Sequence, residues 1–176
     1  MSEDNKNKLG QLLWTKERIE KKKKLSKQLD LLLSPGDYSF LSFEESDEID
    51  LVGDDWPEDK WTNNLFIQSD VSNFTNIEKA ISSFARINDK QFLYVFFINY
   101  NFGLVAMSND IVIKYWAKFI EIDGDEIFLY HPGMNYFICV ELTEDIIVGE
   151  KLNGRRWIFE LTFSNEKIKD AILLNI

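Results

Sequence analysis

Two groups of carboxylates are the residues of this chain whose types and spacing could do chemistry. The first group lies in residues 37–60, where ten acidic residues accompany a single lysine. The second is Asp123, Asp125 and Glu126, in a stretch whose composition favours a turn. Convergent carboxylates serve as general acid and base in glycoside hydrolysis, or hold a divalent metal. Exposed on a surface, the same groups instead attract a basic partner.

Large aromatic residues accompany the first group, since Trp56 and Trp61 lie within it or just after it. Tryptophan is enriched among the residues that dominate protein interfaces. We therefore interpret both groups as surface that binds a partner. The candidate contact residues are Glu44, Glu45, Asp47, Glu48, Asp50, Asp54, Asp55, Trp56, Asp59, Asp123, Asp125 and Glu126.

Nucleophilic catalysis has few residues to draw on in this sequence. His131 is the only imidazole and Cys139 the only thiol. His131 precedes a Pro-Gly pair and is expected in a turn, whereas Cys139 lies in an apolar run, where a thiol acts as a small hydrophobe. One His and one Cys cannot form a Cys/His zinc site, and no glycine-rich phosphate loop occurs. We expect no enzyme, no metal and no cofactor.

One catalytic alternative stays open, because a hydrolase needs only two convergent carboxylates. Asp54 with Asp55, or Asp123 with Asp125, could supply them. The spacing around Gly124 lacks the pattern of a calcium loop.

The charge of the chain excludes some classes of partner. It has 176 residues and a formal net charge of −10. Residues 1–30 carry +4, so the remaining 146 residues carry −14. Nucleic acid and anionic membrane are not expected as partners, because both attract basic surfaces. With no apolar run of membrane-spanning length and no signal peptide, we expect a cytoplasmic protein.

The elements that must position these residues are predicted from periodicity and capping signals. A helix is expected within residues 1–33, with one apolar face made of Leu25, Leu29, Leu32 and Leu33. A shorter apolar stripe upstream consists of Leu9, Leu12 and Leu13. Thr75 and Glu78 have the spacing of a capping box, followed by a helix. Ser108 or Asp110 is expected to cap the next helix and Ser164 the last one. Three helices are predicted after the first. Two of them cover residues 76–87 and 165–174. The helix between them would bury a face formed by Ile113, Trp116, Ala117 and Ile120.

Strands are predicted where apolar and β-branched residues dominate. The strands expected are 92–98, 104–107, 126–130, 135–142 and 157–163. In the last of these, Ile158, Glu160 and Thr162 alternate with larger apolar residues, which predicts one exposed face. Short turns between consecutive strands favour an α+β fold with a mainly antiparallel sheet. We expect a single domain over 1–176, with a helical segment 1–33, an acidic segment 37–62 and an α/β core 73–176.

A resemblance adds a functional class to this interpretation. The carrying sequences are Phe97-Ile-Asn-Tyr-Asn-Phe-Gly103, Lys114-Tyr-Trp116, Ile122-Asp-Gly-Asp125, Phe137-Ile138 and Arg156-Trp-Ile-Phe-Glu160. Over about residues 90–176 the chain resembles the small acidic immunity proteins of bacterial contact-dependent growth inhibition and polymorphic toxin systems. The resemblance implies a cytoplasmic protein that binds one cognate toxin, often a nuclease domain, and blocks its active site. Some proteins of this kind accept a toxin β-hairpin at a sheet edge.

The sequence thus predicts an immunity protein that forms a one-to-one complex with a toxin, expected to be a basic nuclease domain. Beside the hydrolase, a second alternative is a non-catalytic adaptor that uses its N-terminal helix to pair with another helix.

Overall fold

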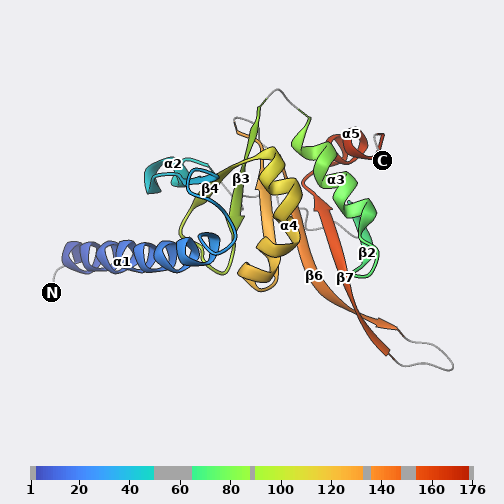
Figure 1. The fold of residues 1–176 in the computed structure, drawn as a ribbon. Coiled ribbons are helices and arrows are strands. Elements are labelled where there is room, and N and C mark those ends of the chain that lie inside the picture. The colour runs from blue at the N-terminus through green and yellow to red at the C-terminus, as the bar shows by residue number, and fades with distance from the viewer. Residues whose placement is uncertain (1–2, 50–64, 88–89, 133–135, 148–153, 175–176) are drawn as a thin grey trace.

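The computed structural model describes residues 3–49, 65–87, 90–132, 136–147 and 154–174, and Figure 1 shows their arrangement. Within them, seven strands form one sheet in the order β1-β4-β3-β5-β6-β7-β2. Every neighbouring pair is antiparallel. The strands are β1 (Tyr38–Phe40), β2 (Phe66–Asp70), β3 (Phe92–Phe97), β4 (Leu104–Ser108), β5 (Glu126–Tyr130), β6 (Phe137–Ile147) and β7 (Gly154–Phe163).

Helices cover one face of this sheet, which confirms the predicted α+β class. α4 (Asn109–Asp123) crosses the sheet, with α3 (Thr75–Ala85) and α5 (Glu166–Leu173) beside it (Figure 1). The predicted apolar stripe of α3 is buried throughout, from Ile77 to Ala85. Two further helices, α1 (Glu3–Leu29) and the short α2 (Phe43–Asp47), lie at the β1 end of the sheet (Figure 1). No helix in the described residues is long and apolar enough to cross a membrane.

The main core lies between the sheet and the helices, and a second apolar cluster lies on the opposite face. The main core includes Leu25 and Leu29 of α1, which are fully buried as predicted. The second cluster consists mainly of aromatic residues from neighbouring strands. Their side chains point to the face of the sheet opposite the main core. Its buried members are Phe96, Leu104, Phe128, Tyr130, Phe137 and Cys139.

Burial on both faces overturns the expectation that the last strand is half exposed. Ile158, Glu160 and Thr162 are 3%, 1% and 1% exposed. The alternation of polar and apolar residues was misleading, because Glu160 is accommodated by a neighbour: Gln68 Nε2 of β2 donates a hydrogen bond of 2.7 Å to Glu160 Oε2. β6 and β7 also extend beyond their predicted bounds and project from the sheet as a two-stranded ribbon (Figure 1).

Two of the three predicted helix caps are wrong. Ser108 caps α4 as expected, since its side chain accepts from the Ile111 N–H. Phe74 occupies the N-cap position of α3, so Thr75 is already helical and no side-chain cap forms. Asn165 caps α5 in place of Ser164, whose hydroxyl instead accepts from the Phe137 N–H at 3.1 Å.

The buried face of α4 is also shifted from the prediction. Trp116 and Ile120 are buried as expected, whereas Ile113 and Ala117 are only partly buried. Val112, Phe119 and Asp123 complete the buried face.

A close approach between α2 and the β3–β4 turn fixes the β1 end of the molecule. Gly103 has φ +143°, and a Cβ built there would lie 2.6 Å from Ser46 Oγ and 2.9 Å from Ser46 Cβ. The same Ser46 hydroxyl accepts from the Leu104 N–H at 3.1 Å. Only glycine leaves room for this contact, so α2 depends on Gly103 for its position.

Gly103→Ala should therefore lower the free energy of unfolding by about 1–3 kcal/mol through the forced contact and the strained φ. Gly36→Ala is the matched control, because Gly36 also has a positive φ, +96°, yet a Cβ added to it would meet nothing within 4 Å. Chemical denaturation of both variants measures the difference. Equal losses would show that backbone strain, and not the contact with Ser46, sets the cost.

Candidate partner-binding surface

α2 presents three of the predicted acidic residues to solvent. Ser42 and Glu45 form a capping box: Ser42 Oγ accepts from the Glu45 N–H at 3.1 Å, and Glu45 Oε2 accepts from the Ser42 N–H at 2.8 Å. The Ser42 backbone and side-chain hydrogen bonds lower the pKa of Glu45. Glu44, Glu45 and Glu48 are all exposed, so this short helix carries a concentrated negative charge at the surface.

Asp47, the fourth predicted acid of α2, is engaged within the chain. Its Oδ2 lies 2.8 Å from Arg18 Nη1, and the Arg18 side chain is 7% exposed. Arg18 Nε also donates to the Phe102 carbonyl oxygen at 2.6 Å, and the guanidinium carbon lies 4.3 Å from the ring centre of Phe43. Asp47 therefore helps to join α1, α2 and the β3–β4 turn, besides adding to the acidic surface.

Asp123 is buried, which corrects its assignment as a surface contact. It is 6% exposed at the end of α4, and the Asn99 N–H donates to its Oδ1 at 3.1 Å. Asn99 Nδ2 donates to the Asp123 carbonyl oxygen at 3.0 Å. Burial raises the pKa of Asp123 to about 7, although hydrogen bonds from the Asn99 and Glu126 backbones act in the opposite direction. The carboxyl group stabilises the β3–β4 turn and is not offered to a partner.

The two acidic groups, far apart in sequence, meet at one feature of the fold. Ser46 of α2 contacts the β3–β4 turn (98–103) directly, and Arg18 of α1 bridges Asp47 of α2 to Phe102 in the turn. The end of α4 contacts the same turn through Asp123. Asp125, in the bend that follows α4, is exposed. The turn is thus bordered by acidic residues on two sides. We call this region, formed by α2, the turn and the end of α4, the acidic rim.

Glu126 lies in the sheet rather than on the rim. It is aligned with Glu141 of β6, which is aligned in turn with Glu160 of β7. The three carboxylates therefore form a row across the face of the sheet opposite the helices. Cys139 Sγ lies 3.4 Å from Glu126 Oε2 and donates to it. Glu126 is partly buried, which makes it a weaker candidate for contact than Asp125.

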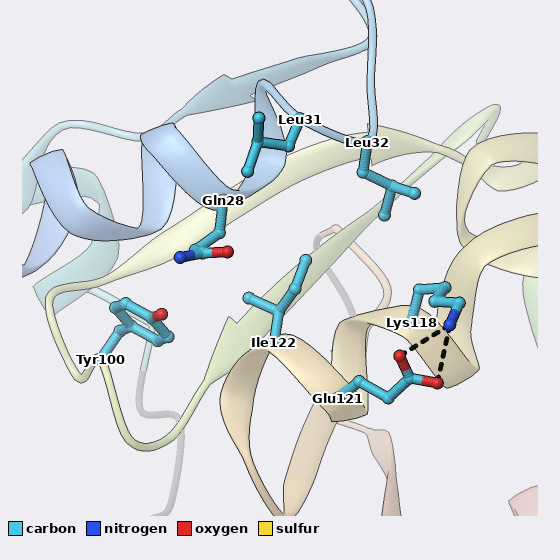
Figure 2. A pocket seen from close by; sticks show the side chains of 7 residues that line it. All are labelled: Gln28, Leu31, Leu32, Tyr100, Lys118, Glu121 and Ile122. Atoms are coloured by element: carbon cyan, nitrogen blue, oxygen red, sulfur yellow. Dashed lines mark hydrogen bonds and ion pairs between the residues drawn. The ribbon is translucent and has the colours of Figure 1, made fainter.

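A groove beside the rim was not predicted, because its residues come from three distant segments. Figure 2 shows it between the end of α1, the β3–β4 turn and the last turns of α4, with a volume of about 450 Å³. Leu31 is 85% exposed at its edge. Lys118 and Glu121 form an exposed ion pair of 2.7 Å on the α4 side (Figure 2). The lining residues are Gln28, Leu31, Leu32, Tyr100, Lys118, Glu121 and Ile122.

A second, more apolar groove lies on the other side of α4. Its volume is about 280 Å³, and Glu121 borders both grooves. Trp157 of the projecting ribbon lines it and is 53% exposed. Large aromatic side chains are rarely left this exposed without a partner, although no sequence signal distinguished Trp157 from the buried Trp116. The surface along α4 therefore combines acidic, apolar and aromatic groups.

The remaining predicted contact residues lie outside the described part of the chain: Asp50, Asp54, Asp55, Trp56 and Asp59. The same holds for Trp61 and for the second half of the acidic segment 37–62.

His131 and Cys139 lie on opposite faces of the sheet. His131 is 1% exposed and packs on α3, where its Nε2 lies 2.6 Å from the Phe84 carbonyl oxygen. A carbonyl only accepts, so Nε2 carries the hydrogen, and burial lowers the pKa of the ring. Cys139 is buried in the aromatic cluster of the other face, as expected for a core thiol. His131 thus lies directly after β5, in the connection to β6 as expected, and its side chain is buried.

Comparison with known proteins gives no family assignment. No protein-family model, no curated protein and no solved structure matches the chain. In the described ranges, no group of three or more His, Cys, Asp and Glu is placed to hold a metal ion.

The raised pKa of Asp123 predicts how stability depends on pH. Because folding raises this pKa from its ordinary value near 3.8 to about 7, the folded state holds a proton that the unfolded state releases in that interval. The contribution of Asp123 is fully present below about pH 4 and is lost as the pH rises through about 7. One proton corresponds to a slope of at most about 1.4 kcal/mol per pH unit.

Asp123→Asn should remove this slope, while the amide oxygen can still accept from Asn99. The measurement is urea denaturation of both proteins between about pH 4.5 and 7.5, with the contribution taken as their difference. That difference also cancels the opposite contribution of His131, whose lowered pKa weakens the fold as the pH falls below about 6.5. Parallel pH profiles for the two proteins would contradict a protonated Asp123.

Proposed function

We propose that the chain is a non-catalytic binding protein that neutralises a toxin, with the acidic rim as its contact surface. The partner is a basic toxin domain, such as a nuclease, bound one to one in the cytoplasm. The observation that carries the proposal is the placement of exposed carboxylates on two sides of the β3–β4 turn, those of α2 on one side and Asp125 on the other, with a groove and the exposed Leu31 at the same turn. Acidic charge of this kind steers a basic partner and selects it by sign.

The composition of the groove supports a protein partner. It joins the apolar Leu31 and Leu32 to an exposed ion pair, and protein interfaces combine an apolar centre with a polar rim in the same way. The resemblance of residues 90–176 to bacterial immunity proteins is the reason that we propose a toxin as the partner. The acidic residues Glu44 and Glu48 have no ion-pair partner in the described part of the chain, so they are available to a basic surface.

Charge reversal tests the rim. Glu44→Lys with Glu48→Lys should slow association with the cognate toxin domain by about tenfold or more at low salt. The variant spares Glu45 and Asp47, which hold the capping box and the ion pair with Arg18. Stopped-flow kinetics measures the association rate constant, and survival of cells that co-express both proteins measures neutralisation.

The matched control reverses Glu166 and Asp170, which have the same spacing on α5 and are also exposed. Both double variants change the net charge equally, so they separate local contact from overall charge. Equal association rates for the two variants would remove α2 from the interface, and absence of any toxin binding would refute the proposed function itself.

Truncation of Leu31 tests the groove independently of charge. Leu31→Ala should raise the dissociation constant by about tenfold through the loss of buried apolar surface, with little change in association rate. Leu174→Ala is the control, because Leu174 is 86% exposed, close to the 85% of Leu31, and lies at the end of α5. Isothermal titration calorimetry measures both constants. An unchanged affinity for Leu31→Ala would place the interface away from the groove.

A further inference from the structure

α1 exposes apolar residues from position 12 to position 19 that the described part of the chain leaves uncovered. In Figure 1 the N-terminal half of the helix projects away from the sheet. Leu12, Leu13 and Ile19 are 68%, 58% and 41% exposed. Leu12 and Ile19 are seven residues apart and therefore lie on the same side of the helix. That side is turned by about 100° from Leu25 and Leu29, which anchor the helix to the core.

The same exposed side carries unpaired positive charge. Residues 10–29 contain seven basic and two acidic residues, a net charge of +5. Lys16 and Lys23 are exposed, continue the line of Leu12 and Ile19, and take part in no ion pair within the described residues. A membrane surface requires a continuous apolar face, whereas here Lys16 lies between the two apolar residues. The pattern fits a protein surface that offers carboxylates beside apolar side chains.

α2 is a surface of that kind within the same molecule. Its exposed Glu44 and Glu48 also have no ion-pair partner in the described part of the chain. Its Phe43 lies beside the middle of α1, with the Lys22 ammonium 5.9 Å from the ring centre. In the described part of the chain, exposed lysines of α1 and exposed glutamates of α2 thus carry complementary charges without an ion-pair partner.

We propose that α1 is a dimerisation arm whose exposed line of residues, from Leu12 to Lys23, binds α2 of a second copy. Because α2 lies beside the middle of α1, a two-fold axis that crosses the two antiparallel arms near their middle brings each α2 to this line on the other arm. Each copy gives and receives the same contact, so the interface closes as a dimer. Leu12 and Ile19 supply the apolar anchors, and Lys16 and Lys23 meet Glu44 and Glu48. Without α2, two arms of charge +5 would repel each other.

The dimer uses two of the acidic residues that the proposed function assigns to a toxin. Self-association and toxin binding therefore exclude each other at α2, and a tight toxin complex shifts the dimer to the one-to-one state. The dimer itself does not depend on the identity of the partner, so it is tested with the purified chain in the absence of any toxin.

Sedimentation velocity of the full chain, from about 2 to about 200 µM, should show a dimer that about 500 mM salt weakens at least tenfold relative to about 50 mM. Lys16→Glu with Lys23→Glu should raise the dimer dissociation constant at least tenfold. Adding Glu44→Lys and Glu48→Lys to the same chain should restore it, because the pairs then exist with their signs exchanged. Leu12→Ser with Ile19→Ser should abolish the dimer at both salt concentrations.

Lys167→Glu with Lys169→Glu on α5 is the control for net charge and should leave the dimer intact. Circular dichroism checks that each variant is folded, which the exposure of the substituted α1 side chains favours. A chain that stays monomeric at the highest concentration overturns the proposal. Failure of the variant with all four charges exchanged to form the dimer also overturns the proposal, because the arm would then bind a surface other than α2. Neither result bears on toxin binding, which the Lys16→Glu, Lys23→Glu variant should retain.

Discussion

The buried guanidinium of Arg18 is the interaction on which the β1 end of the molecule depends. A cation removed from water is costly unless it is paired and hydrogen-bonded. Arg18, 5% exposed, meets this requirement with the Asp47 carboxylate, the Phe102 carbonyl oxygen and the ring of Phe43. These groups belong to α2 and to the β3–β4 turn, so one side chain of α1 holds three segments together. Loss of any one of them would leave a buried charge partly unsatisfied.

The opposite charges of the two ends of the sequence therefore do not form two separate poles. The basic helix lies against the first part of the acidic segment, and Arg18 and Asp47 neutralise each other there. What remains for a partner is the charge beyond this pair: the exposed glutamates of α2 on one side and the exposed lysines of α1 on the other. Because these lie close together, a partner bound at one surface would compete with a partner bound at the other. A net charge of −10 alone would not have suggested this competition.

Periodic burial could be predicted from the sequence, whereas polar contacts between distant segments could not. The stripes of α3 and of the C-terminal part of α1 were correct, because apolar residues at helical spacing leave few alternatives. Capping failed at Ser164 because two neighbouring residues can cap and the hydroxyl of Ser164 is used by Phe137. Glu160 was predicted to be exposed because no neighbouring residue in the sequence indicates its hydrogen bond with Gln68. The one local signal for the burial of Arg18 was that it is an arginine among lysines, because arginine is preferred over lysine in buried ion pairs.

The concentration of acidic residues on α2 indicates that this helix serves a function beyond stability. Glu44 and Glu48 lie four residues apart, on and just after a five-residue helix that has no basic residue of its own. Like charges at this spacing repel, and only the capping box and the favourable interaction of Glu44 and Glu45 with the helix dipole offset the cost. α5 carries a similar acidic pair, Glu166 and Asp170, but Lys167 and Lys169 lie between them. Stability alone would favour the arrangement of α5 over that of α2. Sites that depart from local consistency are commonly those that serve a function, and α2 departs from it where its carboxylates face solvent.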